Sequence, residues 1–549
     1  MWDYIIVGAG TAGCVLANRL SEDPNNRVLL LEAGSSDWSP FIHMPGGLGR
    51  LTGAAFNWRF HTVPQKNLNG RRVWCPQGKT LGGSSSINAM IYIRGQREDF
   101  DDWAALGNRG WSYDDVLPYF RKSENNGRLC DRFHGSDGPL GVFDHADIHA
   151  ISRAFVNATH QYGLPINPDF NGASAYGAGF YQVNCQRGRR LSASKAFLGP
   201  VKRRTNLTIR KNARVLSIKM ANGRATGVEV SAGRSTELLV AGREVILSAG
   251  AINSPRLLML SGIGDADELS KIGVTPVHHL AGVGKNLQDH LNVNVHVQTK
   301  DPISYDGRGD YPAALVHGAR WLLRRTGPAS GAIVQGGGFH KSTGSGRPDL
   351  QIHAVLATVV HGGQTKIAGN GFSVNSAYLR PHSRGSVSLR SANPMDEPLI
   401  DPNYLDDPHD REMAVLSIRK IRDILAQPAM ADLIQDERLP GAHSTTDEDL
   451  LAYAREYACS DHHPVGTCRM GTGSDAVVGP DLRVKGIDGL RVIDSSIMPR
   501  LISGNTNAAT MMIAEKGADL VLAGQSADKL SFLGVPVRHE APKQDAERV

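Results

Sequence analysis

A glycine-rich turn near the start of the sequence, Gly8-Ala9-Gly10-Thr11-Ala12-Gly13, restricts the fold more than any other feature. It follows a short apolar run at 4–7 and precedes a helix-like segment at 14–20, and a second apolar run at 27–31 completes a strand–helix–strand unit. In such a unit the first glycine makes the turn, the second lets the backbone approach a pyrophosphate, and the third packs the helix against the strand. Glu32 ends the second strand 19 residues after the last glycine, where a carboxylate can accept a hydrogen bond from a ribose hydroxyl. We therefore expect a Rossmann-like dinucleotide-binding fold of the α/β class, and the motif alone does not distinguish FAD from NAD.

Composition and short motifs exclude several other functions. The 60 Lys and Arg residues are nearly balanced by 54 Asp and Glu residues, and both signs are mixed along the chain, which argues against nucleic-acid binding. The six cysteines lie far apart without a C-x-x-C pair, so we expect reduced thiols and no metal site. The sequence also lacks the H-E-x-x-H, G-x-S-x-G and Walker patterns of zinc enzymes, serine hydrolases and P-loop NTPases.

We expect neither a secretory signal nor a membrane-spanning segment. The first residues include an acid at Asp3, and the apolar run that follows ends after four residues. No window contains about 18 consecutive apolar residues, the length that a spanning helix needs. We therefore expect a cytoplasmic protein. Peripheral attachment to the inner face of the cell membrane stays open, although no strongly basic amphipathic helix stands out in the sequence.

Two long segments give the sequence a resemblance to a known family. Residues 78–90, GKTLGGSSSINAM, and residues 250–264, GAINSPRLLMLSGIG, match the two signatures of the glucose-methanol-choline (GMC) flavoprotein oxidoreductases. The resemblance continues at 283–290, 399–405 and 463–471 and so extends over nearly the whole chain. Within the family the sequence is most similar to bacterial alcohol and choline dehydrogenases that pass electrons to an acceptor other than NAD.

The resemblance implies FAD as the cofactor. Glycines suit its site, because a flat ring needs backbone without side chains, and donors near N1 stabilise the reduced flavin. Some relatives attach FAD covalently to a histidine in the segment 78–90, but this chain has Ile87 at that position, which implies non-covalent FAD. By the same resemblance the cofactor-binding residues are Gly8, Gly10, Thr11, Ala12, Gly13, Glu32, Ala33, Trp58, Thr80, Gly82, Gly83, Ser84, Asn88, Ala89, Met90, Val215, Ser248, His462, Asp494, Ser495, Asn507 and Ala508.

The resemblance also implies a catalytic pair, His463 and Asn507. An imidazole with a pKa near the working pH suits removal of a hydroxyl proton, and an amide can donate a hydrogen bond to the developing alkoxide. Spacing alone does not separate His463 from His462, for which the resemblance implies a contact with the flavin. Asn505 lies equally close to Asn507 in the sequence, and a turn-capping role is the simpler interpretation of it.

Other histidines are weaker candidates. His340, His353 and His361 lie in the middle of the chain, where they either line the substrate side or, as we expect in preference, are satisfied surface histidines. His290 is expected to have a structural role in a loop.

The resemblance and the strand pattern predict two domains. The substrate-binding domain is expected to contain an antiparallel sheet with flanking helices, because 300–380 holds short strand-like runs and 409–426 has helical spacing. We predict a discontinuous FAD-binding domain at 1–150, 200–299 and 455–525, a substrate-binding domain at 151–199 and 300–454, and a C-terminal tail at 526–549.

The predicted reaction is oxidation of a primary alcohol to an aldehyde, with His463 as the base, hydride transfer to flavin N5 and electrons passed to a non-NAD acceptor of the quinone type. An alcohol oxidase that uses O₂, a non-redox enzyme similar to hydroxynitrile lyases and a binding protein with a vestigial flavin are the alternatives. Choline would require an acid and aromatic faces around its ammonium group, so a primary aliphatic or aromatic alcohol is the more general prediction. The sequence indicates no oligomeric state.

Overall fold

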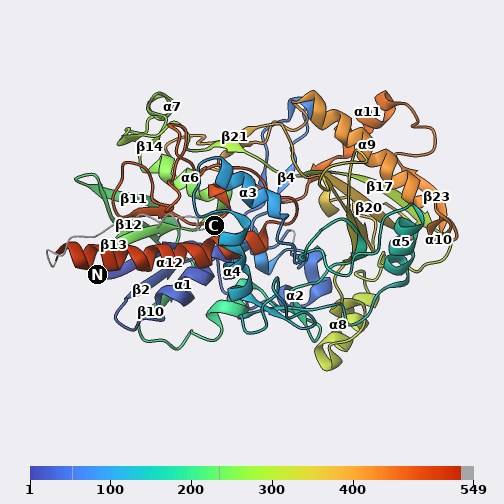
Figure 1. Cartoon of the computed structure of the whole chain (residues 1–549), viewed down its shortest axis with the longest axis horizontal. Coiled ribbons are helices and arrows are strands. Elements are labelled where there is room, and N and C mark those ends of the chain that lie inside the picture. Colours follow the sequence, from blue (N-terminus) through green and yellow to red (C-terminus); the bar gives the residue numbers. More distant parts are fainter. Residues whose placement is uncertain (52, 234, 366, 533–549) are drawn as a thin grey trace, which may run out of the picture.

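Two sheets organise the molecule (Figure 1), as the computed structural model of residues 1–51, 53–233, 235–365 and 367–532 describes it. The first sheet has the strand order β10-β2-β1-β13-β12-β11, and β25 pairs with β13. Strands β10, β2, β1, β13 and β25 run parallel, whereas β11, β12 and β13 form antiparallel pairs. The bounds are β1 (Trp2–Val7), β2 (Val28–Leu31), β10 (Leu207–Arg210), β11 (Val215–Ala221), β12 (Arg224–Ala232), β13 (Ser235–Leu247) and β25 (Leu490–Val492).

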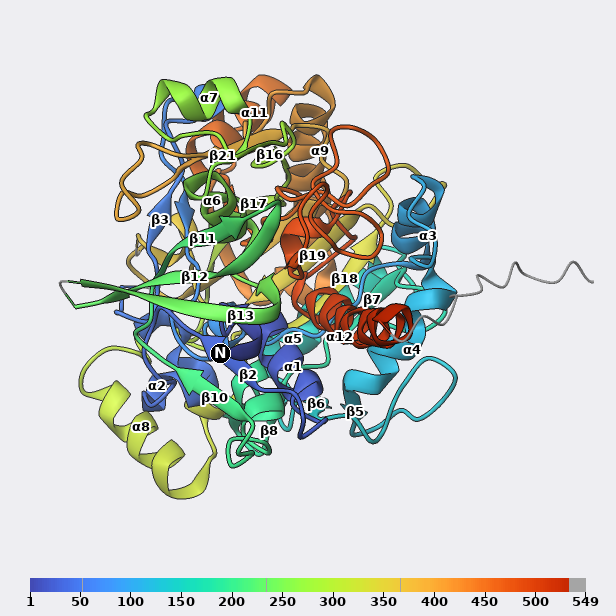
Figure 2. The same ribbon diagram turned by 90° about the vertical axis from the view of Figure 1, so that its left-hand side faces the viewer.

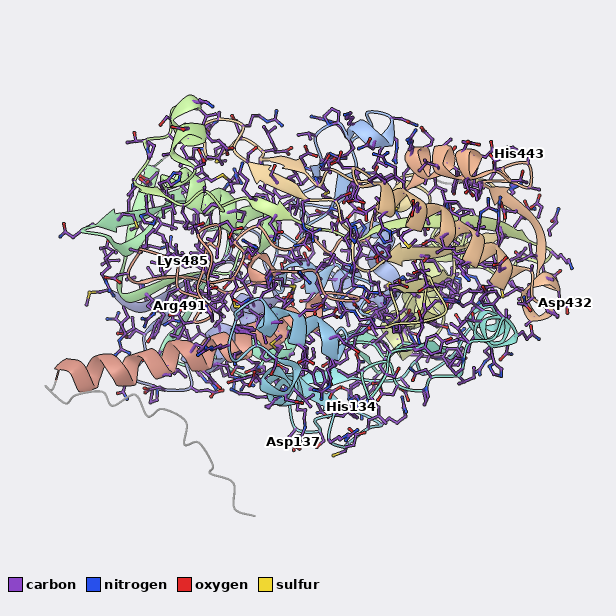
Figure 3. The ribbon with its side chains drawn as sticks, turned by 45° about the horizontal axis from the view of Figure 1, so that its top comes forward. His134, Asp137, Asp432, His443, Lys485 and Arg491 are labelled. Carbon is purple, nitrogen blue, oxygen red and sulfur yellow. The ribbon has the colours of Figure 1, made fainter. Side chains whose placement is uncertain are left out.

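Both ends of the chain contribute to this first layer. Helix α12 (Asn507–Phe532) packs against α1 (Thr11–Leu20), as both ribbon views show (Figures 1 and 2), and Arg19 forms an ion pair of 2.7 Å with the buried Glu515. Strand β25 is fixed by Arg491, labelled in Figure 3, whose buried guanidinium contacts Glu244 at 2.7 Å. Strand β2, with the sequence VLLL, is apolar and buried throughout, as expected for a central parallel strand.

The second sheet is antiparallel and carries helices on one face. Its order is β23-β17-β20-β19-β18-β7, and β24 pairs with β17. Residues alternate along each strand, so Ile352 and Ala354 of β19 pack toward the helices while His353 and Val355 point the other way. The bounds are β7 (Gly177–Phe180), β17 (Leu291–Thr299), β18 (Val334–His340), β19 (Leu350–Val355), β20 (Gly371–Tyr378), β23 (Ile434–Leu439), β24 (Cys459–Ser460), α5 (Ala150–Gln161), α9 (Pro408–Leu425), α10 (Pro428–Ala431) and α11 (Asp447–Tyr457).

Shorter elements surround the two sheets. They are α2 (Pro40–His43), α3 (Arg97–Ala105), α4 (Tyr113–Ser123), α6 (Gly250–Leu260), α7 (Ala266–Lys271), α8 (Ala313–Arg324), β3 (Phe60–His61), β4 (Trp74–Cys75), β5 (Glu124–Asn126), β6 (Leu140–Val142), β8 (Cys185–Gln186), β9 (Arg189–Arg190), β14 (Ile263–Gly264), β15 (His278–His279), β16 (Lys285–Leu287), β21 (Gly385–Ser388) and β22 (Leu399–Asp401). Within the residues described, no helix combines the length and the apolar character that crossing a bilayer requires.

The α/β fold class expected from the sequence is confirmed, with two differences at the predicted boundaries. Strand β17 pairs with β20 and β23, so residues 291–299 belong to the second sheet although the predicted boundary after 299 gave them to the cofactor-binding part. Helix α12 continues to Phe532 and so includes the first residues of the predicted tail; residues 533–549 lie outside the described part of the chain.

Candidate active site

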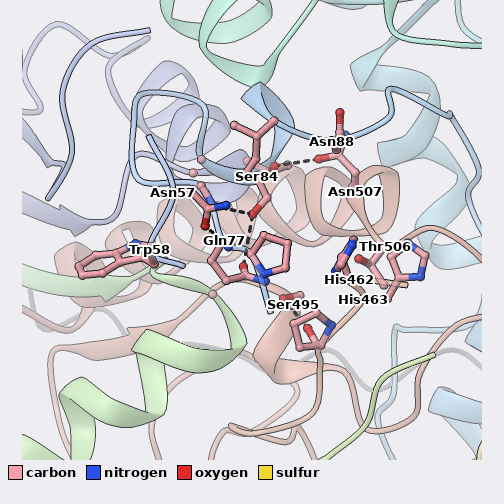
Figure 4. A pocket seen from close by; sticks show the side chains of 18 of the residues that line it. Asn57, Trp58, Gln77, Ser84, Asn88, His462, His463, Ser495, Thr506 and Asn507 are labelled. Carbon is pink, nitrogen blue, oxygen red and sulfur yellow. Dashed lines mark hydrogen bonds between the residues drawn. The ribbon is translucent and has the colours of Figure 1, made fainter. Parts of the chain in front are cut away.

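A cavity of about 420 Å³ lies between the two sheets, a size typical of cofactor and substrate pockets. One end is lined by the glycine-rich turn and Glu32, and the other by the face of the second sheet that carries His353 and Val355. Figure 4 shows His462 and His463 beside Thr506, across the cavity from Trp58. The cavity therefore joins the predicted cofactor-binding residues to the predicted catalytic histidine.

The glycine-rich turn fits a dinucleotide phosphate. A Cβ on Gly13 would lie 1.9 Å from the carbonyl oxygen of Gly8, so this glycine is needed for helix-to-strand packing. A Cβ on Gly10 would meet no atom nearer than 3.9 Å, and Gly10 lines the cavity, so the space beside it is available to a ligand. Helix α1 begins there without a side-chain cap, which leaves its first N–H groups directed at an anion.

Glu32 is held in position by two backbone groups. Its Oε2 accepts a hydrogen bond from the N–H of Ala9 at 2.9 Å, and its Oε1 accepts one from the N–H of Gly34 at 2.7 Å. Burial raises the pKa of Glu32 to about 7. Each carboxylate oxygen keeps a further lone pair, so the side chain can still accept a ribose hydroxyl from the cavity.

Most of the predicted cofactor-binding residues line this cavity. Gly13, Thr80, Gly82 and Ala508 do not: Gly13 packs on Gly8, the Thr80 hydroxyl donates to the carbonyl of Ser35, Gly82 makes a turn with φ of 87°, and Ala508 is buried. The lining residues are Gly8, Gly10, Thr11, Ala12, Glu32, Ala33, Trp58, Gly83, Ser84, Asn88, Ala89, Met90, Val215, Ser248, His462, Asp494, Ser495 and Asn507.

Asp494 lines the cavity, but protein groups occupy its carboxylate. Its Oδ2 accepts hydrogen bonds from the N–H of Gly250 at 2.9 Å and from the hydroxyl of Ser254 at 2.5 Å, and its Oδ1 accepts one from the N–H of Ser496. Asp494 therefore fixes the start of α6 against β25 beneath the cofactor end of the cavity.

His463 is held by its backbone and by two neighbouring side chains. Its N–H donates to Oδ1 of Asp289 at 2.8 Å, and its Nδ1 lies 3.0 Å from Nδ1 of His290 and 3.6 Å from Oδ2 of Asp461. Burial lowers the pKa of His463 to about 4, although the charge of Asp461 acts in the opposite direction. The imidazole is therefore neutral at neutral pH, which is the form that accepts a proton.

The tautomer of His463 follows from the partners of His290. Nε2 of His290 lies 3.2 Å from the carbonyl oxygen of Leu379, which can only accept, so this nitrogen carries the hydrogen. Burial lowers the pKa of His290 to about 3, so the ring is neutral and its Nδ1 is an acceptor. Nδ1 of His463 must then be the donor between the two rings. This assignment places the lone pair of His463 on Nε2, where it can accept a hydrogen bond or a proton.

Asn505, and not Asn507, lies beside this nitrogen. Nδ2 of Asn505 is 3.1 Å from Nε2 of His463, and Oδ1 of Asn505 accepts a hydrogen bond of 3.1 Å from Gln351. Oδ1 of Asn507 instead accepts a hydrogen bond of 2.8 Å from the hydroxyl of Thr11. Both amides line the cavity, Asn505 from the loop before α12 and Asn507 from its first residue, so the catalytic role expected for Asn507 stays a prediction beside the observed contact of Asn505.

The remaining histidines differ in whether they line the cavity. His462 has a left-handed φ of 65° and packs edge-on against Trp74 at 5.7 Å, still within the cavity lining. His353 is buried rather than a surface residue: its Nδ1 contacts Asn375 at 2.9 Å, and its Nε2 has no hydrogen-bond partner among the described residues. His340 and His361 do not line the cavity. His353 thus belongs to the site. The alternation of His353 with the apolar Ile352 and Ala354 along β19 was the sequence pattern that could have indicated it.

Comparison with known proteins identifies the family. Models described as GMC oxidoreductase match residues 2–292 and 381–514. The chain belongs to the GMC oxidoreductases. It is 44% identical to the alcohol dehydrogenase [acceptor] of Pseudomonas putida over 95% of this chain and 96% of that protein. It is 43% identical to human mitochondrial choline dehydrogenase over 95% of this chain and 89% of that protein.

A solved relative agrees on the fold and the cofactor. The structure titled "Effect of mutation (R554K) on FAD modification in Aspergillus oryzae RIB40formate oxidase" is 28% identical, with a TM-score of 0.90 over 96% of this chain and 99% of that chain. This GMC oxidoreductase is therefore an FAD enzyme that resembles alcohol and choline dehydrogenases.

Proposed function

We propose that this GMC oxidoreductase oxidises a primary alcohol that carries no permanent positive charge to its aldehyde, with His463 as the base and a quinone-type compound as the final acceptor. The observation that carries the proposal is the neutral His463 imidazole, whose Nε2 faces the cavity beside Asn505. The Pseudomonas putida relative is named for an acceptor that its name does not specify, and the quinone-type acceptor is the expectation carried over from the sequence.

Named side chains of this chain would each have a role in oxidation of the alcohol. On binding, the alcohol hydroxyl replaces the Asn505 amide as the hydrogen-bond partner of His463 Nε2. Nε2 then takes the hydroxyl proton, and the N–H of Asn505 donates to the oxygen as negative charge develops on it. His290 accepts the Nδ1 hydrogen of His463 and so orients the ring, and the charge of Asp461 lies 3.6 Å from the same nitrogen. FAD, bound without a covalent link because position 87 is isoleucine, supplies the acceptor for the hydride that leaves the alcohol carbon.

The residues near His463 favour a neutral substrate. Amides and aliphatic side chains prevail there, including Asn292, Asn294 and Val355. Asp461 is the acid at this end among the described lining residues. Its Oδ1 accepts a hydrogen bond from the amide of Asn292 at 3.1 Å, and its Oδ2 has no hydrogen-bond partner among the described residues and lies 3.6 Å from Nδ1 of His463. A quaternary ammonium needs an acid and aromatic faces directed at it, and this carboxylate oxygen lies at the Nδ1 side of the His463 ring rather than at Nε2, so we expect a neutral alcohol to be preferred.

A matched pair of alcohols tests this proposal. Choline and 3,3-dimethyl-1-butanol have the same shape and differ in the central nitrogen or carbon atom. Under anaerobic conditions we expect the neutral alcohol to bleach the oxidised flavin with the larger ratio of reduction rate to dissociation constant. Stronger reduction by choline would refute the neutral-substrate proposal, and a flavin that no primary alcohol bleaches would refute the reaction.

Reoxidation of the reduced flavin tests the acceptor. The flavin colour should return slowly in air and quickly with a soluble quinone; the reverse order would identify an oxidase.

A further inference from the structure

Helix α8 (Ala313–Arg324) presents its apolar side to solvent. Leu315, Val316, Leu322 and Leu323 are between 58% and 83% exposed, and their spacing of i, i+1, i+7 and i+8 places them on one face. A helix on a globular protein normally buries such a face against the core. The exposed apolar face of α8 therefore requires a partner outside the described chain.

The opposite face of α8 attaches it to the protein. Trp321 is its buried residue and packs against Met44 and Ala329. The indole N–H of Trp321 donates to the carbonyl of Gly188, in the turn between β8 and β9. The contacts of Trp321 thus fix the orientation of α8 and leave its apolar face toward solvent. In both ribbon views α8 projects from the body of the protein (Figures 1 and 2).

Positive charge lies along one flank of this apolar face and beneath the helix. Arg320 and Arg324 lie one turn apart along the flank of α8, and Arg187 and Arg189 are exposed on the hairpin that receives Trp321. From residue 311 to residue 348 the sequence contains no aspartate or glutamate. An outward apolar face with arginines beside it and without acids is the pattern of a helix that lies in the headgroup region of a membrane.

The same charge disfavours a second copy of the chain as the partner. In a twofold dimer through α8 the face would meet itself, so both copies would bring Arg320 and Arg324 into one contact. Like charges brought together in a desolvated contact are costly. An anionic lipid surface offers the opposite charge to the arginines and a hydrocarbon boundary to the leucines.

We propose that α8 is a peripheral membrane-docking helix that binds the surface of an anionic bilayer. The helix leads through the short turn Pro328–Ser330 into Ile333 and Val334, which line the cavity. The 3₁₀ helix Pro45–Arg50, which contacts that turn, also contributes Leu48 to the lining. Docking through α8 thus brings this side of the cavity close to the lipid phase, where apolar alcohols and quinones concentrate.

Vesicle co-sedimentation of the FAD-loaded enzyme tests the docking proposal. We expect binding to vesicles with about 30% phosphatidylglycerol and weaker binding to pure phosphatidylcholine, with the difference reduced by salt because the headgroup attraction is screened. The double variant Leu322→Asp with Leu323→Asp should weaken binding by at least about tenfold, because both side chains leave the interface. Arg320→Glu with Arg324→Glu should remove the preference for the anionic lipid.

Matched controls separate docking from general surface effects. Leu238→Asp changes a residue of β13 that is 57% exposed, and Arg109→Glu changes an exposed arginine outside this surface; both should bind vesicles as the unchanged enzyme does. All variants should keep the flavin spectrum and reduction by alcohol, so the result does not depend on the substrate proposed above. Absence of vesicle binding, or equal binding by the α8 and β13 variants, would overturn the proposal. A dimer that the α8 leucine variant dissociates, without vesicle binding, would overturn it in favour of a second copy.

Discussion

Nδ1 of His290 lies 3.0 Å from Nδ1 of His463, with the two rings nearly perpendicular at 87°. The carbonyl of Leu379 fixes the hydrogen of His290 on the far nitrogen, and this in turn fixes the hydrogen of His463. A residue expected from the sequence to have only a structural role therefore positions the proposed base.

Substitution of His290 should slow reduction of the flavin without displacing it. In His290→Phe the Nδ1 hydrogen of His463 loses its acceptor, and we expect anaerobic reduction by alcohol to slow roughly five- to tenfold, the effect of about 1 kcal/mol from one hydrogen bond. His290→Asn places an amide oxygen near the lost Nδ1 and should recover most of the rate. Equal rates in the two variants, measured by rapid mixing, would contradict a tautomer-setting role.

Asn505 and Asn507 provide a direct comparison within one loop. Asn505→Ala removes the donor beside His463 Nε2 and should lower the reduction rate by about 10²- to 10³-fold, as loss of an oxyanion donor does. Asn507→Ala removes the acceptor of the Thr11 hydroxyl and should mainly lower the free energy of unfolding, by about 1 kcal/mol. Rate constants from anaerobic mixing and thermal unfolding curves measure both effects. A larger rate loss in Asn507→Ala would restore the assignment made from the sequence.

The pH dependence of reduction should report the burial of His463. Because burial lowers its pKa to about 4, the neutral, proton-accepting form persists from alkaline pH to weakly acidic pH. The reduction rate at saturating alcohol should therefore stay constant down to about pH 5 and fall at lower pH, as the ring becomes protonated. Asp461→Asn removes a charge that favours the protonated ring and should move the inflection to still lower pH. An inflection near 6.5, the ordinary histidine value, would show that the ring is not desolvated.

The sequence predicts the cofactor end of the site better than the substrate end. In the turn from Gly8 to Gly13 the spacing of the glycines is itself the signal, and Gly13 meets the backbone of Gly8 only five residues away, although Gly8 packs against the distant Ser248. Asn505 and Asn507 differ by two positions, and only the start of α12 decides which amide reaches His463. His353 acquires its role through the pairing of β19 with β18 and β20, contacts distant in the sequence that its immediate neighbours do not reveal.

The flavin should leave the protein on denaturation. Position 87 is isoleucine, which cannot form a covalent bond to FAD, and it packs with Ile42 and Leu51 beside the cavity. Acid precipitation followed by centrifugation should leave the yellow colour in the supernatant, with the mass of free FAD by mass spectrometry. Colour retained in the pellet would reveal a covalent link through another residue.

Alanine at the first-turn glycines should separate folding from cofactor binding. A Cβ at Gly13 would lie 1.9 Å from the backbone oxygen of Gly8, so Gly13→Ala should destabilise even the flavin-free protein, by about 3 kcal/mol, because neither backbone can move aside cheaply. A Cβ at Gly10 has its nearest protein atom at 3.9 Å, and the residue has a φ of −74° that alanine adopts readily, so Gly10→Ala should cost the flavin-free protein less than about 1 kcal/mol. The added methyl group does, however, occupy the space available to the pyrophosphate, and FAD affinity should fall by about tenfold or more. Chemical unfolding of the flavin-free proteins and titration with FAD measure the two quantities independently. If Gly10→Ala bound FAD as tightly as the unchanged protein, the phosphates would have to lie elsewhere in the cavity.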